Sequence, residues 1–196
     1  MKYCTILLLT ILASCSIGQN PDINLLKQIN LNRDKSLDGT FKFITQSDPD
    51  LIISVPLGYL ATGWILRDST ITHNGMYLLG TFIFNGILTT GIKDIIKRPR
   101  PFETYTFIDK VVGAGGYSMP SGHTSSAFAL ATSLSIVHPR WYVIAPSFIW
   151  AGAVGYSRLH LGVHYPGDVL AGAALGAGSA LLCNYINKKI FAHNKH

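Results

Sequence analysis

Five long apolar segments without a charged side chain constrain this chain more than any other feature of its sequence. They cover residues 51–66, 76–92, 124–137, 141–157 and 169–187. None alternates between apolar and polar residues as a half-buried strand does, and each is longer than the roughly 5–6 residues of an ordinary strand. The pattern therefore predicts an all-α fold, a bundle of about five helices.

The absence of a charged face favours helices that cross a membrane over helices of a soluble bundle, which normally keep one polar face. The second segment has 17 residues, which span about 25 Å at about 1.5 Å each, slightly less than the roughly 30 Å hydrocarbon core. The last segment contains Gly172-x3-Gly176, whose small residues allow helices to approach closely. We expect five short membrane-spanning helices.

Composition narrows the class of protein further. The chain is 48% hydrophobic and 13% charged, with a formal net charge of +6. Because much of the basic excess lies before residue 51 or near the polar segments discussed below, it indicates an anion pocket and a solvated face, and no nucleic-acid partner is expected. Cys4, Cys15 and Cys183 are widely separated, so no disulfide framework or zinc spacing is visible.

The N-terminal residues 1–18 resemble a secretory signal peptide. A short cationic start precedes an apolar core and an exit of small residues, and the apolar core is too short to span a membrane. Two other interpretations remain open. Leu12-Ala13-Ser14-Cys15 resembles a lipoprotein signal that would lipidate Cys15, and the segment could also persist as an uncleaved anchor.

Residues 19–50 are more polar, and their apolar residues recur at spacings of three, four and multiples of these. The spacing predicts one or two amphipathic helices, broken near residues 30–34. Such helices could lie on the membrane surface, cover the rest of the protein, or simply present a solvated face. No chemistry is assigned to them.

The densest cluster of reactive side chains runs from Ser157 to Asp168. Arg158 offers a planar fork of donors for an oxyanion, and His164 can act as nucleophile or proton carrier. Proline is favoured at the first position of a helix, so Pro166 predicts that His164 lies just outside a helix and Asp168 in its first turn. The carboxylate could then hold one ring nitrogen of His164 and leave the other free to attack.

Two upstream segments complete a pattern: Lys93-x6-Arg100-Pro101 and Pro120-Ser121-Gly122-His123. Together with Ser157-Arg158-x5-His164-x3-Asp168, they resemble the type 2 phosphatidic acid phosphatase (PAP2) superfamily, which also includes bacterial class A acid phosphatases and vanadium haloperoxidases. The resemblance implies a PAP2-type phosphatase domain over residues 51–190, followed by a tail over residues 191–196.

The resemblance also implies a role for each matching residue. His164 would be the nucleophile that forms a phosphohistidine, Asp168 would orient it, and His123 would protonate the leaving oxygen and then activate water. The phosphoryl oxygens would be bound by Lys93, Arg100, Ser121, Gly122 and Arg158. No metal and no cofactor are expected, because cations occupy the places where metal ligands would otherwise be needed.

Neighbouring polar residues are assigned lesser roles. Lys97 and Arg98 are interpreted as anchors at the membrane interface, and His160 as a residue with a local hydrogen bond. The glycine-rich stretch 105–117 is expected to be a flexible loop that lines the entrance for the non-phosphate part of a substrate.

The function expected from these residues is hydrolysis of a lipid phosphate or an isoprenoid diphosphate at a membrane. Three alternatives remain: a soluble periplasmic class A acid phosphatase, a vanadium haloperoxidase-like enzyme, and a non-enzymatic anion-binding or transport protein. The two histidines and the aspartate favour catalytic turnover over binding alone. The oligomeric state is left open.

The order of the segments also predicts a topology. If all five apolar segments cross the membrane, the three polar segments lie on one side, and the basic tail 188–196 lies on the other. A translocated N-terminus places the reactive residues on the periplasmic face of a bacterial inner membrane and the tail in the cytoplasm.

Overall fold

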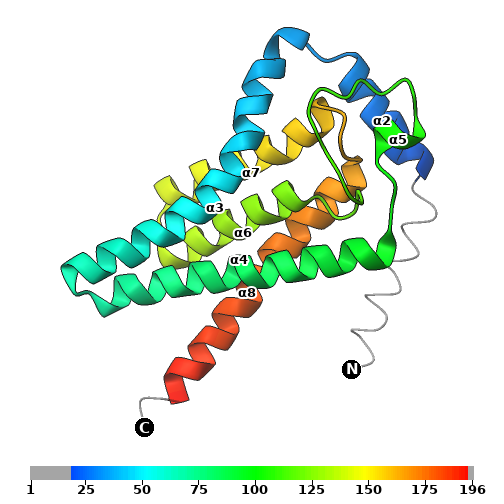
Figure 1. The fold of residues 1–196 in the computed structure, drawn as a ribbon. Coiled ribbons are helices and arrows are strands. Elements are labelled where there is room, and N and C mark those ends of the chain that lie inside the picture. The colour runs from blue at the N-terminus through cyan, green and yellow to red at the C-terminus, as the bar shows by residue number, and fades with distance from the viewer. Residues whose placement is uncertain (1–18, 194–196) are drawn as a thin grey trace.

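The computed structural model describes residues 19–193, and the expected signal peptide, residues 1–18, lies outside the described residues, as do the last three residues of the expected tail. The described chain is all-α, as predicted, and contains no strand (Figure 1). Its elements are α2 (Gln19–Leu31), η1 (Lys35–Leu37), α3 (Asp38–Leu66), α4 (Ser69–Ile96), α5 (Pro101–Thr104), α6 (Gly122–Val137), α7 (Trp141–His160) and α8 (Pro166–His193).

Each of the five apolar segments lies within one of the helices α3, α4, α6, α7 and α8. Among residues 19–193, three stretches are long and apolar enough to cross a membrane: Lys35–Leu66, Ser69–Thr104 and Pro166–Lys189. By contrast, α6 has 16 residues, or about 24 Å, and falls short of the roughly 30 Å hydrocarbon core. Five complete crossings remain a prediction.

The centre of the bundle is α6, which packs against α8, α7, α4 and α3. Its closest neighbour is α8, because small residues replace bulky ones at their contact. A Cβ atom added to Gly176 would overlap the Ser125 carbonyl oxygen and lie 2.9 Å from Ala129 N. The close helix contact predicted from Gly172-x3-Gly176 is thus confirmed.

A tight connection joins α3 to α4 at the far end of the bundle. Arg67 ends α3 in the left-handed conformation, with φ of 52°. Asp68 then caps α4 by accepting hydrogen bonds from Thr70 N at 2.8 Å and Ile71 N at 3.1 Å. These two residues satisfy backbone groups that helix ends would otherwise leave unpaired.

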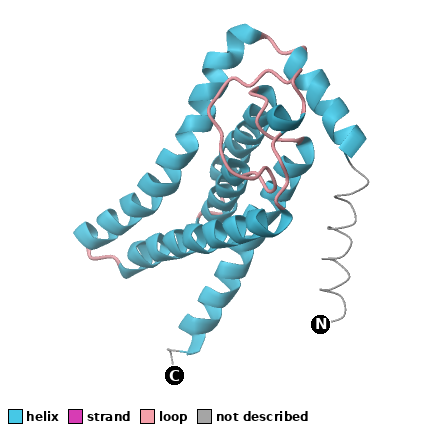
Figure 2. Ribbon diagram, turned by 45° about the vertical axis from the view of Figure 1, so that its right-hand side comes forward, coloured by secondary structure: helices cyan, strands magenta, loops and turns pink. Residues whose placement is uncertain are grey.

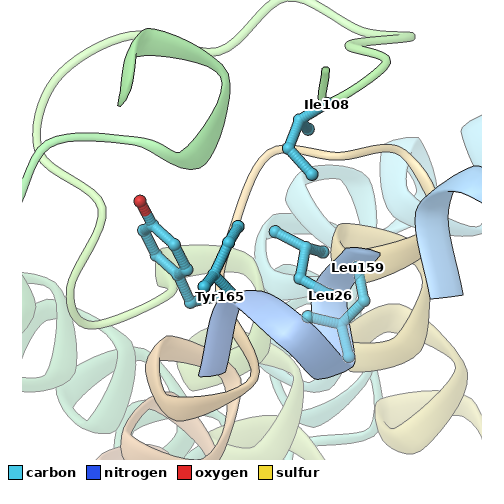
Figure 3. Close-up of a cluster of buried hydrophobic side chains, with 5 residues drawn as sticks. Leu26, Ile108, Leu159 and Tyr165 are labelled. Atoms are coloured by element: carbon cyan, nitrogen blue, oxygen red, sulfur yellow. The ribbon is translucent and has the colours of Figure 1, made fainter. Parts of the chain in front are cut away.

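The opposite end of the bundle carries α2, the long loop between α5 and α6, and the short loop between α7 and α8 (Figures 1 and 2). Figure 3 shows the apolar cluster that holds α2 there. The cluster consists of Ile23, Leu26, Ile108, Leu159 and Tyr165. Of the three arrangements predicted for residues 19–50, the structure shows the second for α2, which covers this end of the bundle.

A buried polar contact reinforces this cluster. Asn30 donates hydrogen bonds to the carbonyl oxygens of Asp109 and His160, both at 3.0 Å, and accepts one from Asp109 N at 2.9 Å. The side chain is fully buried and bonded through both its oxygen and its nitrogen. It ties α2 to the long loop and to the end of α7.

Candidate active site

The loop between α7 and α8 presents His164 beside Asp168. As predicted, α8 begins at Pro166, so His164 precedes the helix and Asp168 lies in its first turn. The His164 Nδ1 atom lies 3.4 Å from Asp168 Oδ2, which also accepts a 3.0 Å hydrogen bond from Tyr165 N. The Ser118 hydroxyl donates a further hydrogen bond to the same Asp168 oxygen.

Burial favours the neutral form of the His164 imidazole. The residue is 2% exposed, and burial lowers the pKa of His164 to about 4, although the adjacent Asp168 carboxylate acts to raise it. Burial penalises the charged ring more than the carboxylate stabilises it. A neutral imidazole keeps the lone pair that a nucleophile needs, and Nε2 carries it when Nδ1 is protonated towards Asp168.

The Nε2 atom of His164 faces a buried arginine. Arg100 Nη1 lies 3.2 Å from it, and the remaining donors of this guanidinium bond to backbone oxygens: Nη1 to Val163 at 2.9 Å, Nε to Gly116 at 2.9 Å and Nη2 to Gly115 at 2.7 Å. The loop between α5 and α6 therefore folds over the cation. Carbonyl oxygens occupy positions that oxygens of an anion could take.

Lys93 is capped by the same loop. Its ammonium donates to the carbonyl oxygen of Tyr117 and, at 3.4 Å, to that of Ser118. Tyr117 is the last residue of the stretch 105–117 that was predicted to line the entrance, and Ser118 follows it directly. That stretch lies directly over the basic residues, where it supplies acceptors.

Arg158 lies deeper in the bundle, at 3% exposure. Its Nη1 donates to Thr45 Oγ1 at 2.6 Å, and its Nε has no hydrogen-bond partner in the described part of the chain. Asp48 and Arg100 are the charges that act on it. An unsatisfied buried donor on a cation is costly unless a ligand completes it.

The segment Pro120-Ser121-Gly122-His123 lies at the N-terminus of α6. Ser121 caps this helix, but its backbone N–H already donates to the Asp168 carbonyl oxygen at 3.0 Å. This N–H therefore serves the close contact of α6 with α8, which leaves the hydroxyl as the Ser121 donor for an anion. The Ser121 hydroxyl accepts from Thr124 Oγ1 at 2.9 Å and keeps its own proton for donation.

Space around Gly122 is left open. A Cβ atom on Gly122 would meet only Thr89 Cγ2, at 3.9 Å, so packing within the protein does not require glycine there. The His123 imidazole makes no side-chain hydrogen bond with the described residues, and the positive charges that act on it come from Arg158, Arg100 and Lys93. The three sequence segments thus converge at one end of the bundle.

The role predicted for Arg98 was wrong. This residue is no free anchor at the membrane interface, because its Nη1 forms a 2.8 Å ion pair with Asp168 Oδ1 and its Nη2 a 2.7 Å ion pair with Asp22 Oδ2. Lys97 adopts a left-handed conformation, with φ of 52°, at the end of α4. The local hydrogen-bonding role expected for His160 is confirmed, with its Nε2 2.8 Å from Asp38 Oδ1.

Four further residues near the site were not predicted from the sequence, and no local sequence signal marks them: Asp22, Thr45, Asp48 and Ser118. Each lies outside the three segments and reaches the site only through packing. Among residues 19–193, no group of three or more His, Cys, Asp or Glu side chains could hold a metal ion.

An all-α bundle with apolar spans, which carries a buried His-Asp pair beside three cations, defines a membrane protein. Residues 74–192 match the family model of the PAP2 superfamily, and the chain belongs to that family. Its fold agrees with a crystal structure of a transmembrane PAP2-type phosphatidylglycerolphosphate phosphatase from Bacillus subtilis, with a TM-score of 0.79, 25% identity, and coverage of 97% of this chain and 98% of the other.

Relatives of known function are named as phosphatases of lipids or isoprenoids. A lipid A 1-phosphatase of Rhizobium etli is 34% identical over 55% of this chain and 48% of its own length. An undecaprenyl-diphosphatase of Sulfolobus acidocaldarius is 31% identical over 85% of this chain and 78% of its own. The chain spans about half the length of the lipid A 1-phosphatases that it matches.

Proposed function

We propose that this protein is a metal-independent phosphatase that hydrolyses a lipid phosphate or an isoprenoid diphosphate through a phosphohistidine on His164. The observation that carries the proposal is the arrangement around that ring: Asp168 holds Nδ1, while Nε2 lies 3.2 Å from Arg100 Nη1. Anion binding and nucleophilic attack would therefore occur side by side.

Binding would replace protein oxygens with phosphate oxygens. The carbonyl groups of residues 115–118 accept hydrogen bonds from Arg100 and Lys93, and phosphoryl oxygens can accept the same hydrogen bonds with a full negative charge. Arg158 would add its unpartnered Nε. Ser121 and Gly122 would contribute a hydroxyl and a backbone N–H at the start of α6, where the helix dipole favours an anion.

The reaction would then proceed in two displacements. His164 Nε2 attacks phosphorus as the bond to the leaving oxygen breaks, and His123 gives that oxygen a proton. Asp168 stabilises the positive charge that develops on the His164 ring. His123 next removes a proton from water, the water oxygen attacks the phosphohistidine, and the P–N bond breaks to release inorganic phosphate. Three cations would stabilise the charge on the equatorial oxygens, the task that metal ions perform in other phosphatases.

A lipid environment for the substrate is supported by exposed apolar side chains on the outer faces of α4 and α8, the helices that carry Lys93 and Asp168. Ile95 lies two residues after Lys93 and is 78% exposed, and Leu170 lies two residues after Asp168 and is 71% exposed. Such side chains are stable against lipid and unfavourable in water. The phosphorylated group would thus reach the site while its hydrocarbon remains in the bilayer, which favours a lipid phosphatase over the soluble acid phosphatase.

The proposed location is the periplasmic face of a bacterial inner membrane. It follows from the expected signal peptide at residues 1–18, five crossings and a basic tail. The substrate pool would then be the outer leaflet.

Phosphate release by the purified protein in detergent tests the function. The panel contains phosphatidic acid, phosphatidylglycerophosphate, undecaprenyl diphosphate and a lipid A phosphate, with His164→Ala as the matched control. We expect wild-type protein to hydrolyse at least one of them, and acid-labile, base-stable phosphate to label wild-type protein only. Undiminished turnover by His164→Ala would refute the mechanism.

A further inference from the structure

Two partly buried ion pairs in series lead from the N-terminal helix to the His164–Asp168 pair. Asp22 Oδ2 lies 2.7 Å from Arg98 Nη2, and Arg98 Nη1 lies 2.8 Å from Asp168 Oδ1. The side chains of Asp22 and Arg98 are each 13% exposed, and that of Asp168 is fully buried. Charge pairs shielded from solvent in this way are screened much less than surface pairs.

The two oxygens of Asp168 have separate partners. Oδ2 faces His164 Nδ1 and accepts from Tyr165 N, whereas Oδ1 pairs with Arg98. The planar guanidinium also lies over the Tyr165 ring, with Cζ 3.8 Å from its centroid. Arg98 therefore fixes the rotation of the carboxylate that orients the nucleophile.

Asp22 fixes Arg98 and the start of α8 together. Its Oδ1 accepts a 2.7 Å hydrogen bond from Gly167 N, one of the N-terminal N–H groups that a helix leaves unpaired. A Cβ atom on Gly167 would lie 2.9 Å from Asp22 Oδ2. Glycine at this position thus lets the carboxylate approach the backbone beside Asp168.

The position of α2 does not depend on Asp22 alone. The apolar cluster of Ile23 and Leu26 (Figure 3) and the three hydrogen bonds of Asn30 also hold the helix. A change at Asp22 that keeps its shape should therefore leave α2 docked, and its effect should reach the site through Arg98 and Gly167.

We propose that Asp22 is a positioning residue for the His164–Asp168 pair and acts through Arg98. The N-terminal helix would then complete the active site, although it lies outside residues 74–192 that match the family model. This positioning role rests on the proposed phosphatase function. Asp22 touches none of the expected phosphate-binding side chains of Lys93, Arg100 or Arg158, so its loss should slow turnover without weakening binding.

The test is the Asp22→Asn variant of the full chain, assayed with the best substrate of the panel. The amide oxygen can still accept from Gly167 N, but the amide nitrogen places a donor against Arg98. We expect kcat to fall roughly 10–100-fold, by analogy with the loss of a residue that orients a metal-binding side chain, with KM within about twofold. Asp22→Glu, which keeps the charge, should recover part of the rate. Asp50→Asn, the same change at an exposed carboxylate, should leave both constants and the thermal midpoint unchanged.

A double-mutant cycle separates positioning from general destabilisation. In an Arg98→Gln background, Asp22→Asn should cost less than about twofold in kcat, because coupled residues are not additive. Three results would each overturn the positioning role: full additivity, a raised KM with unchanged kcat, or wild-type kcat in Asp22→Asn. The proposed function would still stand in these cases if the wild type is active and His164→Ala is inactive. A wild type that releases no phosphate from any substrate would refute both. If Asp22→Asn does not fold, Arg98→Lys decides: a kcat within twofold of wild type overturns the role, and a loss of tenfold or more supports it.

Discussion

The Nε2 atom of His164 lies 3.2 Å from the Nη1 atom of Arg100, and both side chains are buried. A phosphoryl oxygen bound to this guanidinium would bring its phosphorus within reach of the ring nitrogen. The same nitrogen carries the ring's lone pair when Asp168 holds Nδ1. Binding and attack therefore depend on one contact, and each of the following predictions tests a different part of the arrangement around it.

His123 should matter most when the leaving group needs a proton. The His123→Ala variant should lose roughly 10²–10⁴ in kcat on an alkyl phosphate, and much less on an aryl phosphate whose leaving oxygen is already a good anion. Steady-state rates on the two substrates measure this difference. Equal losses on both would contradict leaving-group protonation by His123.

Glycines 122 and 176 should give opposite results when changed to alanine. At Gly122 a Cβ atom finds open space, with Thr89 Cγ2 at 3.9 Å, so Gly122→Ala should keep its thermal midpoint but raise KM about tenfold or more by obstructing a phosphate oxygen. At Gly176 the Cβ atom would overlap the Ser125 carbonyl oxygen. Gly176→Ala should therefore destabilise the fold by roughly 1–3 kcal/mol. Activity and thermal unfolding of both variants check the pair, and an unstable Gly122→Ala would show that packing requires this glycine.

Activity should not depend on a divalent metal. EDTA should leave the rate unchanged, since Lys93, Arg100 and Arg158 would supply the positive charge. Vanadate should inhibit, because it adopts the five-coordinate shape of the transferring phosphoryl group. Loss of activity in EDTA that magnesium restores would overturn this expectation.

The stability of the protein should fall between about pH 6.5 and pH 4 because of His164. Burial lowers the pKa of His164 to about 4 in the folded state, whereas an unfolded histidine has a pKa near 6.5. The unfolded chain therefore binds more protons in this window, so the free energy of unfolding falls as pH decreases. The contribution is complete above about pH 6.5 and is lost as pH drops through about 4. His164→Gln removes the titrating group, and its thermal midpoint should fall less steeply than that of wild type; parallel curves would contradict the assignment.

Cysteine labelling of intact spheroplasts tests the orientation in the membrane. In a variant that lacks Cys4, Cys15 and Cys183, Gly115→Cys should react with a membrane-impermeant reagent. Asn194→Cys should react only after lysis. The reverse pattern would move the site, and with it the substrate pool, to the cytoplasmic side.

The sequence alone determined the parts of this protein that depend on neighbouring residues. Uncharged runs far longer than a strand predict helices, and Pro166 predicts both the start of α8 and the place of His164 beside Asp168, four residues away. Helix periodicity and capping rules act within a few residues, so such features can be read directly from the chain. The family resemblance extended this to eight residues in three segments, which the fold brings to one end.

Only the tertiary structure decided which distant groups contact the residues of these three segments. Arg98 and Lys97 are adjacent and both cationic, yet only Arg98 reaches Asp168, 70 positions along the chain, and Asp22, 76 positions away. Thr45 meets Arg158, and the carbonyl groups of Gly115 and Gly116 meet Arg100, through the packing of α3 and a loop that carry no catalytic pattern. Such pairs form because buried charges and N–H groups must find partners, and which partner is in reach depends on how the helices pack.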